Sequence, residues 1–421
     1  MPSVFMPSPE LLDSPRRRPW PGLTPLPAHR ADTPPERVAV AVVGAGPAGL
    51  AVASALWHLG IEDVALLDAG ERTCGRFLDR VDRLGQRVLR SPYEHHPGVE
   101  GYRDCELLDF ARLHWGLLTP VERREVRMAQ AGHRSVVPLD VFEAFCGHVA
   151  DAHAVGERTW RATVRSVVPR AEDVVLRTDT GDVRARYVVL CLGEERGTAP
   201  DGWHAGYWDE PVPDDGPLVV VGAGLSAAHL LADALAAGRE AHWVMRANQE
   251  RYQCADVNAA FFRPEGRARF QDTPWERRLD LMSRHRRASV MFEFRPLLEA
   301  AEADGRLTVH RGVEVESVAD GRVRLADGRV VAGGHVALCL GTRPSIGAGL
   351  LPDAVVNAVD GWPDLDPRTL SYTHAPRVLA VGAATAMALG PAARNIDGHR
   401  VATARVAGAV AAGLRAKVGA P

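Results

Sequence analysis

The sequence is almost without lysine, since all of its Lys+Arg residues except Lys417 are arginines. Schiff-base chemistry needs a lysine amine, so we do not expect it in the body of the fold. No C-x-x-C pair occurs among the cysteines, which argues against a redox-active dithiol and against a disulfide framework. A reducing cytoplasm fits this pattern. The six cysteines are Cys74, Cys105, Cys146, Cys191, Cys254 and Cys339.

A clean membrane-spanning segment is also missing. Residues 38–57 carry no charge, but Gly44, Gly46, Pro47 and Gly49 fall in the first half of this run. These residues predict a strand, a tight turn and a helix rather than one long apolar helix. The formal net charge of −3 gives no excess of positive charge for nucleic acid. We therefore expect neither a membrane nor a nucleic acid as a partner.

What the chain has instead is one order of elements that occurs twice. In the first half, "RVAVAVVGAG" predicts a buried parallel strand, followed by a helix and by a strand that ends at Asp68. In the second half, residues 216–247 repeat this order, and the strands "VVLCLG" (188–193) and "VALCLG" (336–341) also match. Alternating segments before each of these two strands predict a β-meander. The prediction is an α/β fold with two Rossmann-like domains, each with a β-meander.

Both halves contain a glycine turn between strand and helix. In a G-x-G-x-x-G turn the first glycine allows the bend, the second lets a pyrophosphate approach, and the third keeps the helix close to the strand, where alanine also fits. The phosphate then lies at the positive N-terminus of the helix. The three positions are Gly44, Gly46 and Gly49 in the first copy, and Gly222, Gly224 and Ala227 in the second. The other turn residues expected beside a dinucleotide are Ala45, Pro47, Ala48, Leu225 and Ser226.

The two copies differ 24 residues after the first glycine, at the end of the next strand. The first copy has Asp68 there, whose carboxylate accepts hydrogen bonds from a ribose diol, so we expect FAD or NAD at that site. The second has Arg246, whose guanidinium pairs with a 2′-phosphate, so we expect NADP. The alternative for Arg246 is a solvated surface arginine.

From about residue 37 to residue 415 the chain resembles the two-dinucleotide-binding-domain flavoproteins, on both glycine turns, the paired "CLG" strands and the late strand "RVLAVGAA". The resemblance implies that the first site binds FAD and the second NADPH, and that the NADPH domain is inserted into the FAD domain. Gly193 then marks the crossing between domains, and Gly382 lies near the flavin. The expected divisions are a flexible or loosely docked Pro-rich tail (1–35), a first FAD-domain segment (36–213), an NADPH domain (214–344) with an insertion at about 247–300, and a second FAD-domain segment (345–421).

Within this group the chain resembles the class B flavin monooxygenases. His204 and Trp208 match the second half of their linker signature, and "VLRSPYEHHPG" (88–98) is similar to the segment beside their flavin. Gly382 is followed by Ala383 where many relatives have aspartate, which argues against the disulfide-reductase branch. The resemblance implies an NADPH-dependent FAD monooxygenase of specialised metabolism that uses O₂ to oxygenate a nucleophilic N or S through a C4a-hydroperoxyflavin. A reductase that feeds a ferredoxin-like carrier, a small-molecule FAD dehydrogenase and a non-catalytic binding protein stay open.

Candidates near the flavin are Arg90, Ser91, His95 and Asn395. Arg90 is a candidate for charge stabilisation of reduced flavin, for binding of an acidic substrate or for a surface salt bridge. Asn395 is a candidate for a bond to the isoalloxazine or for a helix cap. Val164 is a candidate for a backbone contact to adenine. No metal is expected, because the adjacent histidines at 95–96 have no evident co-ligands, and the oligomeric state, a homo-oligomer included, stays open.

Overall fold

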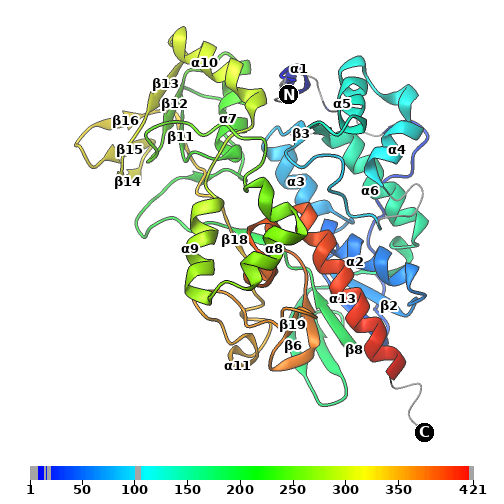
Figure 1. Ribbon diagram of the computed structural model, residues 1–421. Coiled ribbons are helices and arrows are strands. Elements are labelled where there is room, and N and C mark those ends of the chain that lie inside the picture. The colour runs from blue at the N-terminus through cyan, green and yellow to red at the C-terminus, as the bar shows by residue number, and fades with distance from the viewer. Residues whose placement is uncertain (1–7, 14–15, 17–19, 100–105, 417–421) are drawn as a thin grey trace.

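The computed structural model describes residues 8–13, 16, 20–99 and 106–416 of the 421-residue chain. Cys105 and Lys417 lie outside the described residues. The chain forms two α/β bodies, each built on its own mainly parallel sheet. Figure 1 shows the body with β11, β12 and α7 at the upper left and the body with α2, β2 and β8 at the right.

The first sheet runs in the order β19-β20-β8-β1-β2-β5, and its neighbours are parallel except for the edge strand β19. Val40, Ala41 and Val42 of the central strand are fully buried, as the β-branched run predicts. The strands are β1 (Arg37–Val43), β2 (Val64–Asp68), β5 (Thr159–Arg161), β8 (Asp182–Leu190), β19 (Ser371–Tyr372) and β20 (Ala375–Ala380).

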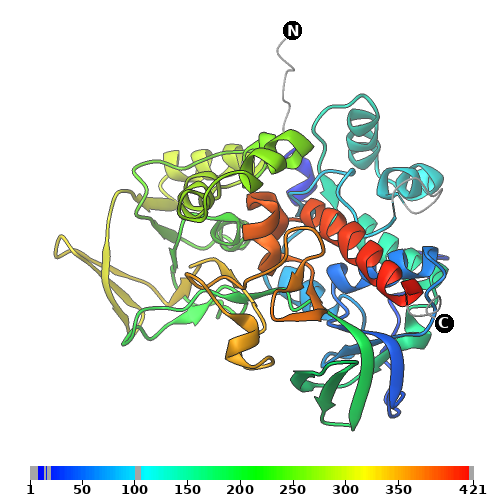
Figure 2. The same cartoon turned by 60° about the horizontal axis from the view of Figure 1, so that its bottom comes forward.

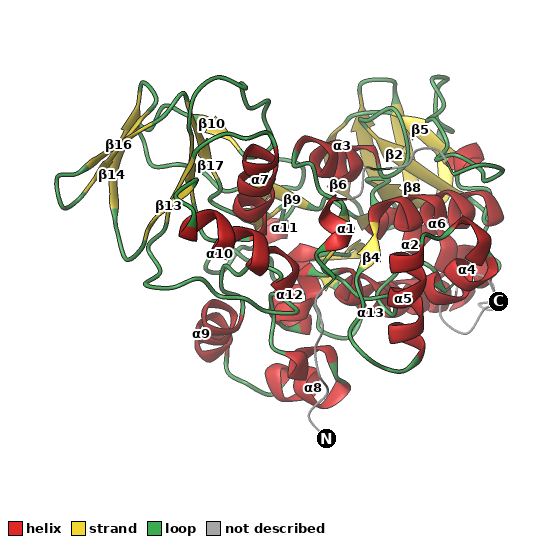
Figure 3. Cartoon of the chain, turned by 90° about the horizontal axis from the view of Figure 1, so that it is seen from above, coloured by secondary structure: helices red, strands yellow, loops and turns green. Residues whose placement is uncertain are grey.

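Helices cover this sheet. The first glycine turn leads from β1 into α2, which packs against α6 and against the long C-terminal helix α13. Figure 3 shows α2, α4, α5, α6 and α13 gathered on one side of the molecule. The helices are α2 (Pro47–His58), α3 (Gly75–Arg83), α4 (Leu107–Leu113), α5 (Pro120–Gln130), α6 (Leu139–Ala152) and α13 (Ile396–Ala416), and the two-stranded ribbon below α5 is β3 (Val88–Leu89) with β4 (Val137–Pro138).

The second body repeats the arrangement. Its sheet runs in the order β10-β17-β11-β12-β13 with all neighbours parallel, and the second glycine turn leads from β11 into α7. The helix α10 packs on α7 and β13. The elements are β10 (Gly206–Tyr207), β11 (Leu218–Val221), α7 (Leu225–Ala236), β12 (Ala241–Val244), α10 (Arg295–Ala303), β13 (Leu307–His310) and β17 (His335–Leu338). Because β10 is a strand of this sheet, the chain enters the second body ahead of residue 214.

Each body carries a β-meander, which confirms the predicted α/β fold with two Rossmann-like domains. In the first, β6 and β7 lead antiparallel into β8, and this meander projects at the bottom of Figure 2. In the second, β14, β15 and β16 form a separate antiparallel sheet. The strands are β6 (Val164–Pro169), β7 (Val174–Thr178), β14 (Val315–Ala319), β15 (Arg322–Leu325) and β16 (Val330–Ala332).

The two bodies are joined by two chain crossings that pair with each other. The outgoing crossing is β9 (Glu194–Arg196) and the returning one is β18 (Thr342–Pro344), and they form an antiparallel two-stranded sheet. The second body is therefore inserted between β8 and β20 of the first.

The predicted insertion is helical and rests on the first body. Its helices α8 (Pro264–Gln271) and α9 (Trp275–His285) contact α12 (Ala386–Leu389) and the 3₁₀ turn η6 (Pro391–Arg394) of the first body. Arg278 Nη1 donates to the Met387 carbonyl (3.0 Å), and Gln271 Nε2 donates to the Ala388 carbonyl (2.8 Å). Figure 2 shows both helices above the end of α13. Both ends of the predicted range 247–300 belong to the second Rossmann unit, since Tyr252, Val290 and Met291 pack in or against its core and α10 packs on α7.

The N-terminal segment, for which the sequence analysis expects a flexible or loosely docked tail, is docked where it is described. Trp20 is 5% exposed in the first core, and Arg16 forms ion pairs with Asp82, Asp140 and Glu143 (2.8–3.0 Å). The short helix α1 (Glu10–Asp13) lies between the two bodies in Figure 3, and its Leu11 packs in the core of the second. Proline lacks a backbone N–H donor, but it does not prevent the side chains of neighbouring residues from being buried.

Candidate dinucleotide sites

The first glycine turn is closed tightly by the strand beside it. Gly44 has φ +101°, and an ideal Cβ on it would lie 2.4 Å from the Cys191 carbonyl oxygen. A Cβ on Gly49 would lie 1.9 Å from the Gly44 carbonyl oxygen, whereas one on Gly46 would meet nothing within 4 Å. The first and third glycines are thus needed for packing, and the open space at Gly46 is where a pyrophosphate fits.

Some backbone N–H groups of the first turn donate within the protein, and others are left for a ligand. The Ala45 N–H donates to Asp68 Oδ2 (2.7 Å), the Ala45 carbonyl accepts from the Cys74 N–H (2.8 Å), and Pro47 has no N–H. Leu50 N–H donates to the Gly46 carbonyl (2.9 Å). Within the described residues, the N–H groups of Ala48 and Gly49 are left without a partner at the positive end of α2. These two groups are suited to an anionic ligand.

Asp68 lies where the sequence analysis places it, at the end of β2. Its Oδ2 accepts from the Ala45 N–H and its Oδ1 accepts from the Gly70 N–H, both at 2.7 Å. These bonds fix the carboxylate against the turn and leave each oxygen a second lone pair. Binding of a ribose diol therefore stays a prediction that the geometry allows.

The second turn is closed by its neighbouring strand in the same way as the first. Gly222 has φ +136°, and a Cβ on it would lie 2.2 Å from the Cys339 carbonyl oxygen. At Gly224 the nearest atom to an added Cβ is the Ala288 methyl, at 4.0 Å. Ala227 replaces the third glycine and is fully buried. Within the described residues no partner is found for the N–H groups that open α7, those of Leu225, Ser226 and Ala227.

Arg246 lies just beyond β12 and is exposed. Its guanidinium forms no ion pair or hydrogen bond among the described residues. A solvent-facing guanidinium at this strand end is open to the 2′-phosphate of NADP, and this role stays a prediction.

The two turns lie at the two ends of the paired crossings. The Cys191 carbonyl that closes the first turn is followed by Gly193 (φ +70°) and β9, and the Cys339 carbonyl that closes the second is followed by Gly341 (φ +78°) and β18. Since β9 pairs with β18, one short ribbon connects both dinucleotide turns. The paired crossings β9 and β18, called the joint below, therefore link the two turns.

Glu194 locks this joint, and sequence reasoning missed it. Its carboxylate accepts from Arg394 Nε (2.5 Å) and from the Thr342 hydroxyl. Burial alone would raise the pKa of Glu194, but Arg394 and Thr342 outweigh it and hold the pKa below its usual value. The only sequence feature that pointed to Glu194 was its place directly after Gly193, the predicted crossing between domains.

Arg90 is not a surface salt bridge. Its Nη1 donates to the Ser289 carbonyl (3.1 Å), and its Nη2 donates to the Ser289 hydroxyl (3.0 Å) and to the Gln253 carbonyl (2.9 Å). Burial lowers the pKa of Arg90 to about 10, so the group is still charged at neutral pH. Arg90 thus connects the first body to the insertion.

His95 lies against the start of α13. Its Nε2 is 3.8 Å from Asp397 Oδ1, and its ring lies 5.1 Å from the Phe262 ring. Burial, together with Arg400, lowers the pKa of His95 to about 4, so the imidazole is neutral near pH 7. Asp397 is 1% exposed and is held by Arg267 (3.0 Å) and Arg400 (2.9 Å). Asp397 was not among the candidates named from the sequence.

Asn395 precedes α13, but its side chain does not cap this helix. Its Oδ1 accepts from Arg286 Nη1 (2.8 Å), and its Nδ2 donates to Asp256 Oδ1 (2.8 Å). Arg286 also pairs with Asp256 (3.0 Å). This network ties the insertion to the first body, and neither insertion residue was predicted, because their partners lie more than 100 positions away.

Two further residues named from the sequence, Val164 and Gly382, lie at the ends of strands. Val164 begins β6, is partly buried and faces Thr178 across the meander. Gly382 follows β20 with φ +99°, and a Cβ on it would lie 3.6 Å from His399 Nε2. Positive φ explains why glycine is used at that point.

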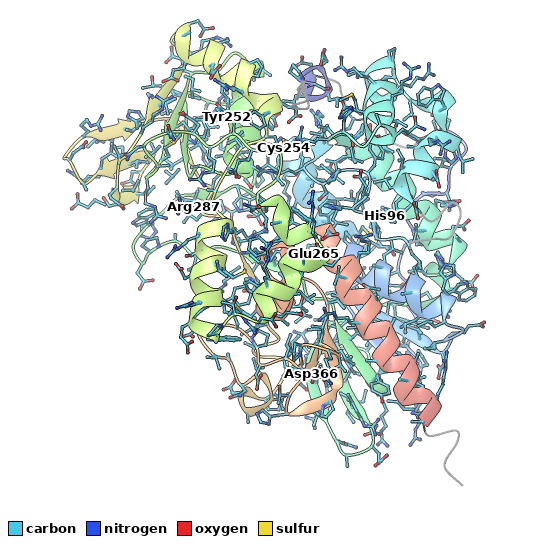
Figure 4. The ribbon with its side chains drawn as sticks, viewed as in Figure 1. His96, Tyr252, Cys254, Glu265, Arg287 and Asp366 are labelled. Carbon is cyan, nitrogen blue, oxygen red and sulfur yellow. The ribbon has the colours of Figure 1, made fainter. Side chains whose placement is uncertain are left out.

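The described residues of the chain hold no cluster of three or more His, Cys, Asp or Glu side chains arranged for a metal ion. Among the helices described, none combines the length and the apolar character needed to cross a membrane. Figure 4 shows Tyr252 in the second body, Cys254 closer to the first body, and Arg287 just past α9.

Comparison with known proteins identifies the fold. Residues 42–104, which include the first glycine turn, match the family model of the NAD(P)-binding Rossmann-like domain. No curated protein sequence matches the chain. Among solved structures, an ornithine N-hydroxylase from Kutzneria sp. 744 has a TM-score of 0.72 at 16% identity, covering 90% of this chain and 100% of that one.

Two other solved structures are similar over the same length. The cadaverine monooxygenase of desferrioxamine biosynthesis from Erwinia amylovora, solved with FAD, has a TM-score of 0.69 at 14% identity and covers 89% of this chain and 94% of its own. The bacillithiol disulfide reductase from Bacillus cereus has a TM-score of 0.60 at 15% identity, with 89% and 99% covered. At this identity the similarity shows that the chain has the fold of two-domain flavoproteins.

Proposed function

We propose that the protein is an NADPH-dependent FAD monooxygenase that oxygenates a nucleophilic nitrogen or sulfur of a small molecule. The observation that carries the proposal is the pair of glycine turns at the two ends of one ribbon, with Asp68 beside one and Arg246 beside the other. A fold that presents two dinucleotide sites to one joint suits transfer between two cofactors.

The residues present fit these cofactors. Gly46, Ala48 and Gly49 would hold the FAD pyrophosphate, with Asp68 on the ribose. The corresponding N–H groups of α7 would hold the NADPH pyrophosphate, with Arg246 on the 2′-phosphate. Bound together, the cofactors would supply hydride transfer and oxygen activation. We assign FAD to the first body and NADPH to the second, which the chain enters ahead of residue 214 and leaves through β18.

The contribution of the chain itself would be to position the cofactors and the substrate and to exclude water from them. The helices α8 and α9 are fixed over η6 and α12 by Arg278 and Gln271, and Arg267 joins α8 to the buried Asp397 at the start of α13. His95 is neutral near pH 7 and is therefore suited to a hydrogen bond rather than to carrying a positive charge.

A primary amine is the substrate we propose first. The ornithine N-hydroxylase and the cadaverine monooxygenase described above act on ornithine and cadaverine, and both of these molecules are primary amines. Such an activity fits specialised metabolism. We further propose a cytoplasmic location, because none of the described cysteines is in a disulfide.

The test is an oxygen-electrode assay of the FAD-loaded protein with NADPH and a panel of amines and thioethers. We expect oxygen uptake that rises with one class of substrate, and mass spectrometry should find that substrate with one added oxygen atom. Uptake that never depends on an added amine or thioether would argue against the proposal.

A reductase is the second candidate, which the similarity to the bacillithiol disulfide reductase favours. In that case NADPH oxidation should require a disulfide or an electron carrier rather than oxygen. The same assay under nitrogen, with a disulfide panel and a ferredoxin, separates the two candidates.

A further inference from the structure

One arginine of the first body holds the backbone of the second. Arg90 follows β3 and donates three hydrogen bonds, two to Ser289 and one to the Gln253 carbonyl (2.9–3.1 Å). Gln253 and Ser289 lie more than 160 positions further along the chain. The planar guanidinium is suited to this task because it reaches several acceptors at fixed angles, which the single nitrogen of lysine does not.

The segment that Arg90 holds is short, and it is buried at Ser289 and Val290. Gln253 N–H donates to the Val290 carbonyl (2.9 Å), and Val290 N–H donates to the Arg251 carbonyl (2.9 Å), so two short stretches pair side by side. Ser289 is 2% exposed and Val290 is fully buried. A buried pair of this kind moves as one unit, and Arg90 fills the acceptors that it leaves at its end.

This segment borders the second glycine turn. Ala288, the neighbour of Ser289, is the nearest group to the open side of Gly224, where an added Cβ would lie 4.0 Å from its methyl. The N–H groups that begin α7 stand next to this opening. Movement of the segment by about 1 Å would therefore narrow or widen the space for a pyrophosphate.

We propose that Arg90 is a positioning residue for NADPH, which acts by holding the 288–290 segment at the width that the second glycine turn needs. The inference rests on the proposed function, because it takes the second turn as the NADPH site. In this role Arg90 itself touches neither cofactor, in contrast to the roles in flavin stabilisation or substrate binding expected from the sequence.

The experiment measures binding of NADP⁺ to the FAD-loaded protein by calorimetry, which needs no turnover. Arg90→Lys keeps the charge and loses the fork, and we expect NADP⁺ affinity to fall about tenfold or more, as loss of hydrogen bonds to a charged group typically does. Ser289→Ala removes only the hydroxyl acceptor, so its effect should be about threefold. FAD content and the KM for the amine should stay at wild-type values.

Arg278→Lys is the matched control. This arginine also donates to one backbone carbonyl across the bodies, that of Met387, and to the Thr273 carbonyl within the insertion, but it does not touch the 288–290 segment. Its NADP⁺ affinity should equal that of the wild type. In the double variant of Arg90→Lys and Ser289→Ala the two effects should not add, because both remove one shared hydrogen bond.

Three results would overturn the inference. Unchanged NADP⁺ affinity in Arg90→Lys, or an equal loss in Arg278→Lys, would show that the arginine is only a structural contact. A raised KM for the amine with unchanged NADP⁺ affinity would make Arg90 a substrate residue. If Arg90→Lys does not fold, Ser289→Ala alone decides. Wild-type protein that binds no NADP⁺ refutes the proposed function itself, whereas normal wild-type binding with unaffected variants refutes only the role of Arg90.

Discussion

Gly49 of the first glycine turn has no room for a side chain. An ideal Cβ there would lie 1.9 Å from the Gly44 carbonyl oxygen and 3.0 Å from its carbon. Contacts this short are not tolerated, so Gly49→Ala has to move α2 away from the turn by about 1 Å. Overpacking of this kind typically costs about 1–3 kcal/mol. The same shift displaces the Ala48 and Gly49 N–H groups that would hold the FAD pyrophosphate.

The second turn supplies a natural control. Ala227 occupies the equivalent position and is fully buried, so that turn already accepts a methyl group. Ala227→Gly should cost only about 1 kcal/mol from the lower helix propensity of glycine, apart from the loss of one small contact. Gly49→Ala and Ala227→Gly thus exchange glycine and alanine at the third position of the two turns, and we expect only Gly49→Ala to create a steric clash.

The assay is the flavin content of the purified protein, read from its absorbance, together with the thermal midpoint. We expect Gly49→Ala to be purified with little FAD and with a midpoint several degrees below that of the wild type. Ala227→Gly should keep its FAD. Gly49→Ala with full flavin content and an unchanged midpoint would refute the tight closure of the first turn.

Three further predictions concern charged groups. Arg246→Ala should reduce the preference for NADPH over NADH in kcat/KM about 10- to 100-fold, since a charge-assisted hydrogen bond to a phosphate is lost, and an unchanged ratio would place the 2′-phosphate elsewhere. Burial raises the pKa of Glu143 to about 7 despite Arg16, so the folded protein binds a proton at this carboxyl more tightly than the unfolded chain does. Stability should therefore fall as the pH rises from about 4.5 to about 7. Glu143→Gln should remove this slope in thermal midpoints, and its midpoint at about pH 8 should be higher than that of the wild type. Burial lowers the pKa of His96 to about 4, so its contribution to stability should be lost as the pH falls from about 6.5 to about 4; His96→Phe should flatten this dependence, and an unaltered acid limb would contradict it.

The local motifs could be read from the sequence because they depend on neighbours in the chain. Gly44 and Gly222 need positive φ to complete a turn between a strand and a helix, and only glycine adopts that conformation readily. Asp68 follows its strand at a fixed spacing, which is a geometric property of the unit itself. These features were therefore visible without any tertiary contact.

The partners of the central polar residues could not be predicted in the same way. Asn395 bonds to Arg286 and Asp256, and Arg90 bonds to Ser289, across separations that no local pattern encodes. The many arginines made each one look like a surface charge, and burial alone separates those that hold the bodies together. The prolines of the N-terminal segment left a flexible and a loosely docked tail open, and the buried Trp20 gives the described part an apolar anchor.

The stoichiometry of the two dinucleotides, measured anaerobically on one preparation, decides whether each glycine turn holds its own ligand. We expect one FAD per chain, one NADP⁺ bound per chain by calorimetry, and bleaching of the flavin absorbance by NADPH but only weakly by NADH. A protein that takes up no FAD, or that binds two equivalents of NADP⁺ and no flavin, would contradict the assignment of one ligand to each glycine turn.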